Sequence, residues 1–194
     1  MKTNIKKIVD KYLDYYPEED LSKLQLLLEH NKDNESNLFN RKNFEGHITA
    51  RGFIYSLNDY KLLLLEHKAL NKFLQPGGHV ENVDNEIIDS ARREILEETG
   101  LSDLKNISIE DDINIPFDIN SHFIPANEKK AEDGHYHHDF RFLFVVDKEE
   151  DVKLDSNESN DYKWIYVNGL IDDKTFGLSI KKIIDIVQKK KKIK

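Results

Sequence analysis

Residues 76–101 read PGGHVENVDNEIIDSARREILEETGL, and they constrain the fold more than any other stretch of the chain. An apolar stripe at i, i+3 and i+7 predicts an amphipathic helix over residues 86–98; its members are Ile88, Ala91 and Ile95. Gly100 follows where a C-cap glycine would end that helix. A Gly-Gly turn is expected at residues 77–78. Glycine there would let the backbone approach a ligand closely.

Three carboxylates share one face of the predicted helix. With about 100° per residue and Glu94 at zero, Glu97 falls near −60° and Glu98 near +40°. Like charges at these spacings repel by a few tenths of a kcal/mol per pair, and Arg93 offsets part of that. The face is either solvated or occupied by a cation. Grouped carboxylate oxygens suit Mg²⁺ or Mn²⁺, which bridge phosphate oxygens and activate water.

The rest of the pattern predicts strands on both sides of this helix. The expected strands are residues 47–55, 61–66, 107–109, 140–146 and 161–167. A last helix is expected to begin near Leu178 and to end in KKKKIK, a solvated tail. This order of elements indicates a mixed α/β layer structure.

Residues 1–37 predict a helical hairpin before a main domain at residues 38–194. Pro17 separates a helical pattern over residues 4–14 from a second helix that starts near Ser22. A two-helix hairpin buries too little apolar surface to be stable alone. It therefore needs the main domain or a second subunit to cover, and a homodimer stays open.

Composition excludes several classes of function. The formal net charge is −8 and no long basic stripe is present, so duplex nucleic acid is a poor partner. The chain has no cysteine, which excludes disulfides, thiolate metal sites and cysteine nucleophiles. The N-terminus lacks a signal-peptide pattern, and the purest apolar run, residues 62–65, is too short for a bilayer. We expect a cytoplasmic protein without a membrane partner.

The motif Gly78…Arg93-Glu94-x-x-Glu97-Glu98-x-Gly100-Leu101 resembles the Nudix box, the signature of the Nudix hydrolases. Its second half matches at every fixed position, and PGGHVE at residues 76–81 resembles the opening of one branch of the family. Residues 47–55 and 161–167 resemble the family's first strand and its late tryptophan-containing strand. The resemblance covers about residues 44–190 and implies a Nudix-type α/β/α sandwich with a mixed sheet.

The spacing in the first half of the box departs from the family pattern. Fourteen residues separate Gly78 from Arg93, one more than in the standard box. The isolated central glutamate therefore has no direct equivalent. Asp84 keeps its spacing from Gly78, but we interpret Asp84 as the N-cap of the helix.

The resemblance implies hydrolysis of a nucleoside diphosphate linked to another moiety, with Mg²⁺ or Mn²⁺ and an attacking water. Glu94, Glu97 and Glu98 would hold the metal, and the Gly78 carbonyl would add a ligand. Arg93 would orient a carboxylate, with Glu97 expected from its i+4 position. The general base is either Glu94 or an acid on a later loop; the candidates there are Glu128, Glu132, Glu149 and Glu150.

Three other functions compete with hydrolysis. A non-catalytic nucleotide-binding or regulatory module is the alternative, although such modules tend to lose the box acids that this chain keeps. Isopentenyl-diphosphate isomerases use a cysteine, which is absent here. An unrelated acidic-helix interaction domain would not need the Gly-Gly turn. The substrate stays open among ADP-ribose, a damaged nucleoside triphosphate, a dinucleoside polyphosphate and a nucleotide sugar.

A second polar cluster, HYHHDFR, begins at His135. In a strand, alternate side chains share one face, which groups His135, His137, Asp139 and Arg141. These residues are candidates for substrate contact, because Arg and His donate hydrogen bonds to phosphate oxygens. An exposed strand edge is the alternative. A zinc site is a third hypothesis, but the sequence offers no further ligand group that matches it.

Overall fold

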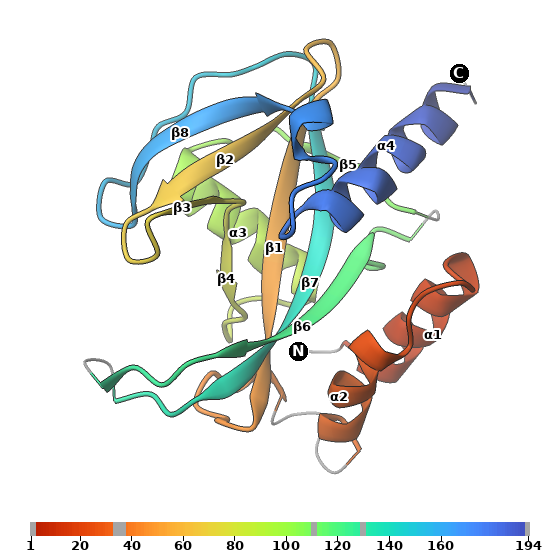
Figure 1. Ribbon diagram of the computed structural model, residues 1–194, viewed down its shortest axis with the longest axis vertical. Helices are drawn as coiled ribbons and strands as arrows, with labels where there is room; N and C mark the ends of the chain where they lie inside the picture. Colours follow the sequence, from red (N-terminus) through yellow and green to blue (C-terminus); the bar gives the residue numbers. More distant parts are fainter. Residues whose placement is uncertain (1–2, 33–37, 110–111, 129–130, 193–194) are drawn as a thin grey trace.

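The chain folds into a mixed sheet with helices packed on both of its faces (Figure 1). The computed structural model describes residues 3–32, 38–109, 112–128 and 131–192. In chain order the elements are α1 (Ile5–Tyr15), α2 (Ser22–His30), β1 (Gly46–Ser56), β2 (Lys61–His67), β3 (Lys72–Leu74), β4 (Gly77–His79), α3 (Ile87–Thr99), β5 (Lys105–Asn106), β6 (Asp118–Ile124), β7 (His135–Val146), β8 (Ser159–Tyr166), the 3-10 helix η3 (Val167–Leu170) and α4 (Gly177–Lys192).

Strands β1 and β7 form the centre of the sheet. They run parallel and stay in register from Gly46↔Tyr136 to Ser56↔Val146. β2 and β4 pair antiparallel with β1, while β5 and β6 pair antiparallel with β7. β3 and β8 extend the sheet beyond β2. β1 and β7 are buried along nearly their whole length, as expected for strands covered on both faces. The mixed sheet predicted from the sequence is confirmed.

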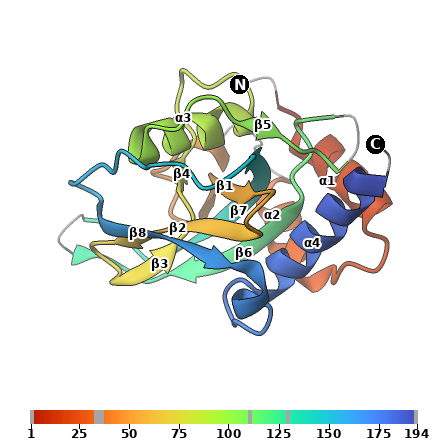
Figure 2. The same cartoon turned by 90° about the horizontal axis from the view of Figure 1, so that it is seen from above.

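Helix α3 covers one side of the sheet and α4 lies on the other (Figure 2). The predicted apolar stripe of α3 is buried, with Ile88, Ala91 and Ile95 at most 2% exposed. Each buried isoleucine contributes roughly 1.5–3 kcal/mol to the packing of this helix. Gly100, with φ of +71°, ends α3 as predicted. Among the described helices, we find none with the length and hydrophobicity that a membrane crossing requires.

Two predictions at the start of the box are wrong. Gly77 and Gly78 do not form a turn but lie in β4, which pairs with β1. Gly77 reaches this edge of the sheet with φ of +149°, a conformation that glycine accepts. Asp84 is not the N-cap either, because α3 starts after Glu86, whose N–H donates to Asp89 Oδ2 at 3.0 Å.

One strand prediction is wrong, and strand β6 was not predicted. Residues 107–109 do not form a strand, since the pairing of β5 with β7 is confined to Lys105 and Asn106. Ile109 is instead buried in the core. β6 has no counterpart in the prediction. The middle residues of β6 are half-buried, and its sequence DINSHFI is correspondingly polar. It therefore lacks the apolar run that marks a central strand.

The N-terminal helices pack against the sheet of their own chain. Tyr12, Leu24 and Leu27 are fully buried, and α2 packs on β6. His30 Nδ1 at the end of α2 lies 3.1 Å from His138 Nε2 on β7. The hairpin therefore packs on the main domain, one of the two surfaces expected for it.

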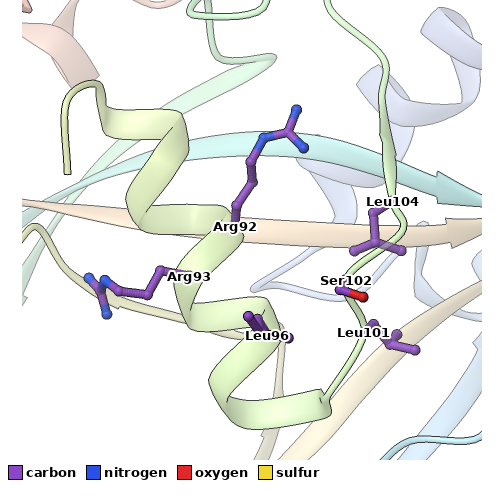
Figure 3. A pocket seen from close by; sticks show the side chains of 6 residues that line it. All are labelled: Arg92, Arg93, Leu96, Leu101, Ser102 and Leu104. Carbon is purple, nitrogen blue, oxygen red and sulfur yellow. The ribbon is translucent and has the colours of Figure 1, made fainter. Parts of the chain in front are cut away.

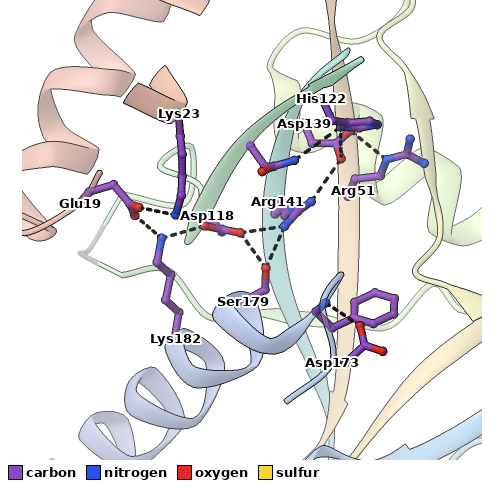
Figure 4. Close-up of polar contacts among 12 residues, drawn as sticks. Glu19, Lys23, Arg51, Asp118, His122, Asp139, Arg141, Asp173, Ser179 and Lys182 are labelled. Carbon is purple, nitrogen blue, oxygen red and sulfur yellow. Dashed lines mark hydrogen bonds and ion pairs between the residues drawn. The ribbon is translucent and has the colours of Figure 1, made fainter. Parts of the chain in front are cut away.

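A buried polar network joins this hairpin to the sheet and to α4 (Figure 4). Lys182 on α4 donates to Glu19 and, at 2.7 Å, to Asp118 Oδ1. Asp118 Oδ2 also accepts from Arg141 Nη1 at 2.9 Å and from Ser179 Oγ at 2.7 Å. Burial alone would raise the pKa of Glu19, but hydrogen bonds from Lys182 and Tyr12 lower this pKa to about 2. Glu19 therefore contributes stability that is present at neutral pH and is lost as the pH falls toward about 2.

Lys182→Met should lower the free energy of unfolding by roughly 3–5 kcal/mol, because Glu19 and Asp118 would stay buried without their shared cation. Lys189→Met is the matched control on the same helix. Its ion pair with Asp185 is more than half exposed, so we expect a loss of at most about 1 kcal/mol. Urea denaturation of both variants at neutral pH measures the difference. Equal stability of the two variants would contradict the role assigned to Lys182.

Candidate active site

The carboxylates of α3 converge on the short strand β4. Glu98 is 8% exposed, and its Oε1 accepts the N–H of Gly77 at 2.7 Å. Glu94 lies beside the neighbouring glycine, such that a Cβ built on Gly78 would lie 2.5 Å from Glu94 Oε1. Any side chain at residue 78 would therefore displace Glu94. The sequence GG at this position is explained by how closely the helix approaches the strand.

Arg93 holds the remaining acids of the box together. Its Nη1 donates to Glu94 Oε1 at 2.8 Å and to Glu97 Oε2 at 3.2 Å, which confirms the expected Glu97 pair and adds a second. Its Nη2 donates to Asp84 Oδ2 at 3.1 Å and to the His79 carbonyl at 2.8 Å. Asp84 is buried and pairs with the box arginine. It therefore ties the segment before α3 to the arginine of the box.

Two acids of this cluster are buried close together, which disfavours their charged forms. Burial raises the pKa of Glu98 to about 8, and the charges of Glu94 and Glu158 add to this effect. Burial also raises the pKa of Glu94, although Arg93 opposes the shift. Glu97 differs, since its side chain is 56% exposed. Oxygen ligands grouped in this way fit a divalent cation such as Mg²⁺ or Mn²⁺.

Arg51 on β1 is a cation that the sequence analysis did not single out. Its Nη1 donates to the Gly77 carbonyl at 2.8 Å, and its Nε donates to Asp139 Oδ1 at 3.1 Å. It is close enough to Glu98 to lower the pKa of that carboxyl. A lone arginine in the otherwise buried strand HITARGFIY is the signal that would have identified it.

Glu158 is the second residue that the sequence analysis missed. Its charge raises the pKa of both Glu94 and Glu98. Its loop is tied to the end of α3, because Asp155 N–H donates to the Glu98 carbonyl at 3.1 Å. Of the loop acids proposed as a base, Glu149 pairs with Lys61 at 2.5 Å and Glu132 lies 3.7 Å from Arg41. The exposed Glu158 is thus a late-loop acid that acts electrostatically on the box.

The polar set predicted on β7 does share one face. His135 Nε2 lies 3.2 Å from His137 Nε2, and Arg141 Nη2 lies 3.5 Å from Asp139 Oδ2. Arg141 is only 8% exposed and also donates to Asp118. The pair is buried rather than exposed at the surface. Burial opposes the charge of Asp139, but Arg51 and Arg141 hold the pKa of its carboxyl well below the usual range.

Two further histidines join this face from other strands. His47 on β1 and His79 on β4 have ring centroids 4.7 Å and 5.3 Å from that of His137. Burial lowers the pKa of His137 to about 2, so this imidazole is neutral at physiological pH. These partners of the β7 histidines could not be predicted, because His47 and His79 are isolated in sequence and meet His137 only through strand pairing.

A hollow of about 230 Å³ lies next to α3 and is drawn in Figure 3. Its lining residues are Arg92, Arg93, Leu96, Leu101, Ser102 and Leu104. None of the three box glutamates lines it. We therefore place the chemistry at the carboxylates beside β4 and not in this hollow.

Comparisons with known proteins place this geometry in a family. The model of the NUDIX domain matches residues 46–185. A probable DHNTP pyrophosphohydrolase of Lactococcus lactis subsp. cremoris (strain MG1363) is 38% identical over 90 residues, 46% of this chain and 49% of the relative. The chain thus spans about half the length of that curated relative.

Solved structures share the fold at low sequence identity. An Ap4A hydrolase of C. elegans, in a binary complex, is 21% identical, with a TM-score of 0.54 over 73% of this chain and 97% of that chain. The dihydroneopterin triphosphate pyrophosphohydrolase of E. coli is 15% identical, with a TM-score of 0.54 over 70% and 92% of the two chains. A NUDIX hydrolase from Clostridium perfringens is 23% identical, with a TM-score of 0.52 over 73% and 96%.

The family match covers most of the chain and includes the whole segment from Gly78 to Leu101, where the acids of α3 meet β4. This protein belongs to the NUDIX family.

Proposed function

We propose that the protein hydrolyses a pyrophosphate bond in a nucleoside diphosphate linked to another moiety, with Mg²⁺ or Mn²⁺. The observation that supports this most is Glu98, a buried carboxylate whose pKa is raised to about 8 beside Glu94 and the Gly77 N–H. A divalent cation bound next to this carboxyl would favour its charged form. Family membership supports the same reaction.

In this proposal Glu94, Glu97 and Glu98 hold the metal, with the Gly78 carbonyl as a further ligand. The bound ion supplies polarisation of a phosphoryl oxygen and lowers the pKa of a bound water. Arg93 and Asp84 fix the acids in position, because their ion pair at 3.1 Å ties α3 to the loop after β4. Glu158 on the late loop accepts the proton of the attacking water, a role that its electrostatic effect on Glu94 and Glu98 supports.

The substrate phosphates are assigned to Arg51 in preference to Arg141. Among the set predicted on β7, Arg141 already donates to Asp118, Ser179 and Asp139. Arg51 is 19% exposed in its side chain and sits between the box and Asp139. Asp139 then positions Arg51, and His135 and His137 line the same face of the sheet.

The substrate is to be found with a nucleotide panel. The panel includes ADP-ribose, damaged nucleoside triphosphates, dinucleoside polyphosphates, nucleotide sugars and dihydroneopterin triphosphate, for which one relative is named. Released phosphate or pyrophosphate is measured with Mg²⁺, with Mn²⁺ and with EDTA. Hydrolysis that requires the metal supports the proposal. Binding of a nucleotide without any hydrolysis would favour a non-catalytic module.

Glu98→Gln and Glu97→Gln should each lower kcat by at least about a hundredfold, because each removes a charged oxygen ligand from the metal that carries the chemistry. Glu149→Gln is the matched control, since Glu149 pairs with Lys61 away from the box. It should leave kcat within about twofold. The measurement is steady-state hydrolysis of the best panel substrate. Near-normal turnover in both box variants would contradict the metal role.

Glu158→Gln should lower kcat by about 10²-fold while metal binding persists, because a general base acts on the water and need not hold the ion. The rise in melting temperature on adding Mg²⁺ reports binding. It should survive in Glu158→Gln and be lost in Glu98→Gln. If Glu158→Gln keeps full activity, the base is another residue, with Glu94 next in line.

Arg51→Lys should raise KM at least about tenfold, because a lysine cannot reproduce a two-pronged phosphate contact. Arg141→Lys is the comparison. It should lower the melting temperature more than it changes KM, since Arg141 is buried among Asp118, Asp139 and Ser179. Kinetics and thermal unfolding of the two variants separate the roles. The opposite pattern would indicate that Arg141 on β7, and not Arg51, contacts the phosphate.

A further inference from the structure

Five histidines gather on the sheet face that points away from the box helix. His47 has its ring centroid 5.0 Å from that of His79, 4.8 Å from that of His135 and 4.7 Å from that of His137. His122 on β6 lies 5.8 Å from His137 by the same measure. They come from four neighbouring strands, β4, β1, β7 and β6. The sequence contains eight histidines, so more than half of them meet here.

This cluster is separate from the carboxylates of the box. In β4, Gly78 pairs with Ala50 and His79 pairs with Thr49. Successive residues of a strand face opposite sides. The Gly78 position faces Glu94 on α3, so the His79 ring lies on the other side, with His47 and His137. Among the described residues, none of the box glutamates takes part in the contacts between the histidine rings of the cluster.

The hydrogen bonds around the cluster determine which ring nitrogens carry protons. His135 Nδ1 lies 2.7 Å from the Asp133 carbonyl, which can only accept, so His135 is protonated at Nδ1. In the neutral form of His135, Nε2 is then an acceptor for His137 Nε2–H at 3.2 Å. In the same way, His47 Nδ1–H donates to the Asn43 carbonyl at 3.1 Å. His137 Nδ1 and His47 Nε2 therefore both carry unprotonated lone pairs.

Those two lone pairs are buried and unused. His47 is 1% exposed and His137 is 9% exposed. His47 Nε2 and His137 Nδ1 have no hydrogen-bond partner among the described residues. A buried polar atom without a partner is destabilising, so packing alone leaves the arrangement unexplained. A metal ion accepts lone pairs of this kind, and metal-binding histidines typically donate their other N–H to a carbonyl or a similar acceptor.

The geometry selects three of the five histidines. One ligand atom from each of His47, His79 and His137 lies within 4.8 Å of the others. A tetrahedral ion with bonds of about 2.0–2.1 Å needs about 3.3 Å between ligand nitrogens, which small ring rotations would provide. A second set pairs His122 and His137 with Asp139. Asp139 is already engaged by Thr49 and Arg51, so it is the weaker choice.

We propose that His47, His79 and His137 bind a borderline transition-metal ion, Zn²⁺ in the first instance, at a site distinct from the Mg²⁺ site of the box. Neutral imidazoles prefer Zn²⁺, Co²⁺, Ni²⁺ or Cu²⁺, whereas carboxylates and carbonyls suit Mg²⁺. Three protein ligands leave the fourth position of a tetrahedral ion open to solvent. The ion ties β4 to β1 and β7. Because the His79 carbonyl accepts from Arg93, it also steadies the edge of the box.

Cobalt spectroscopy on the full chain tests the site independently of hydrolysis. The protein is stripped with EDTA and titrated with Co²⁺ in the presence of millimolar Mg²⁺, which competes for the carboxylates. We expect the visible absorption of four-coordinate Co²⁺ to saturate at one ion per chain. Competition with Zn²⁺ should abolish the absorption and give the Zn²⁺ affinity.

Single variants identify the ligands. His79→Gln and His137→Gln should each raise the Zn²⁺ Kd at least about tenfold. His79 is half-buried, so its variant still tests the site if the variant of the buried His137 does not fold. His122→Gln and Glu98→Gln are the controls and should keep the cobalt spectrum. The proposal is overturned if no tetrahedral spectrum forms, or if binding survives His79→Gln and is lost in His122→Gln or Glu98→Gln.

Discussion

The burial of Glu98 against β4 is the constraint on which the site depends. Burial of Glu98, which is 8% exposed, raises the pKa of its carboxyl to about 8, although the hydrogen bond from the Gly77 N–H opposes the shift. α3 tolerates this because its apolar stripe is packed firmly on the central strands. The packing of the core therefore keeps this acid buried instead of turned to solvent, and a divalent cation bound beside it would favour its charged form.

One short strand separates two kinds of ligand chemistry. Gly78 faces the carboxylates of α3, and His79, the next residue, faces the histidines of β1 and β7. The alternation of a strand thus places oxygen ligands on one side and nitrogen ligands on the other. Arg93 connects the two sides, because it binds both Glu94 and the His79 carbonyl. The position of β4 is therefore common to the proposed hydrolytic site and to the proposed zinc site.

Local patterns predicted much of this structure, and long-range pairing accounts for what they missed. The period of Ile88, Ala91 and Ile95 was enough to define α3, because helix amphipathicity is a local property. The N-cap interpretation of Asp84 is wrong because its side chain pairs with Arg93, nine residues further along the chain. Arg51 and Glu158 come near the box through strand pairing and a late loop. His47 and His79 meet His137 for the same reason, and no spacing in the sequence records that.

The most direct test of the account is the pH dependence of stability in the metal-free protein. Because the folded-state pKa of Glu98 is raised to about 8, its contribution to stability is fully present below about pH 4.5 and is lost as the pH rises toward 8. In EDTA, the free energy of unfolding of the wild type should therefore fall over this range more steeply than that of Glu98→Gln, and Mg²⁺ should remove the difference in slope. Identical slopes for the two proteins in EDTA would contradict a buried carboxylate that awaits a cation.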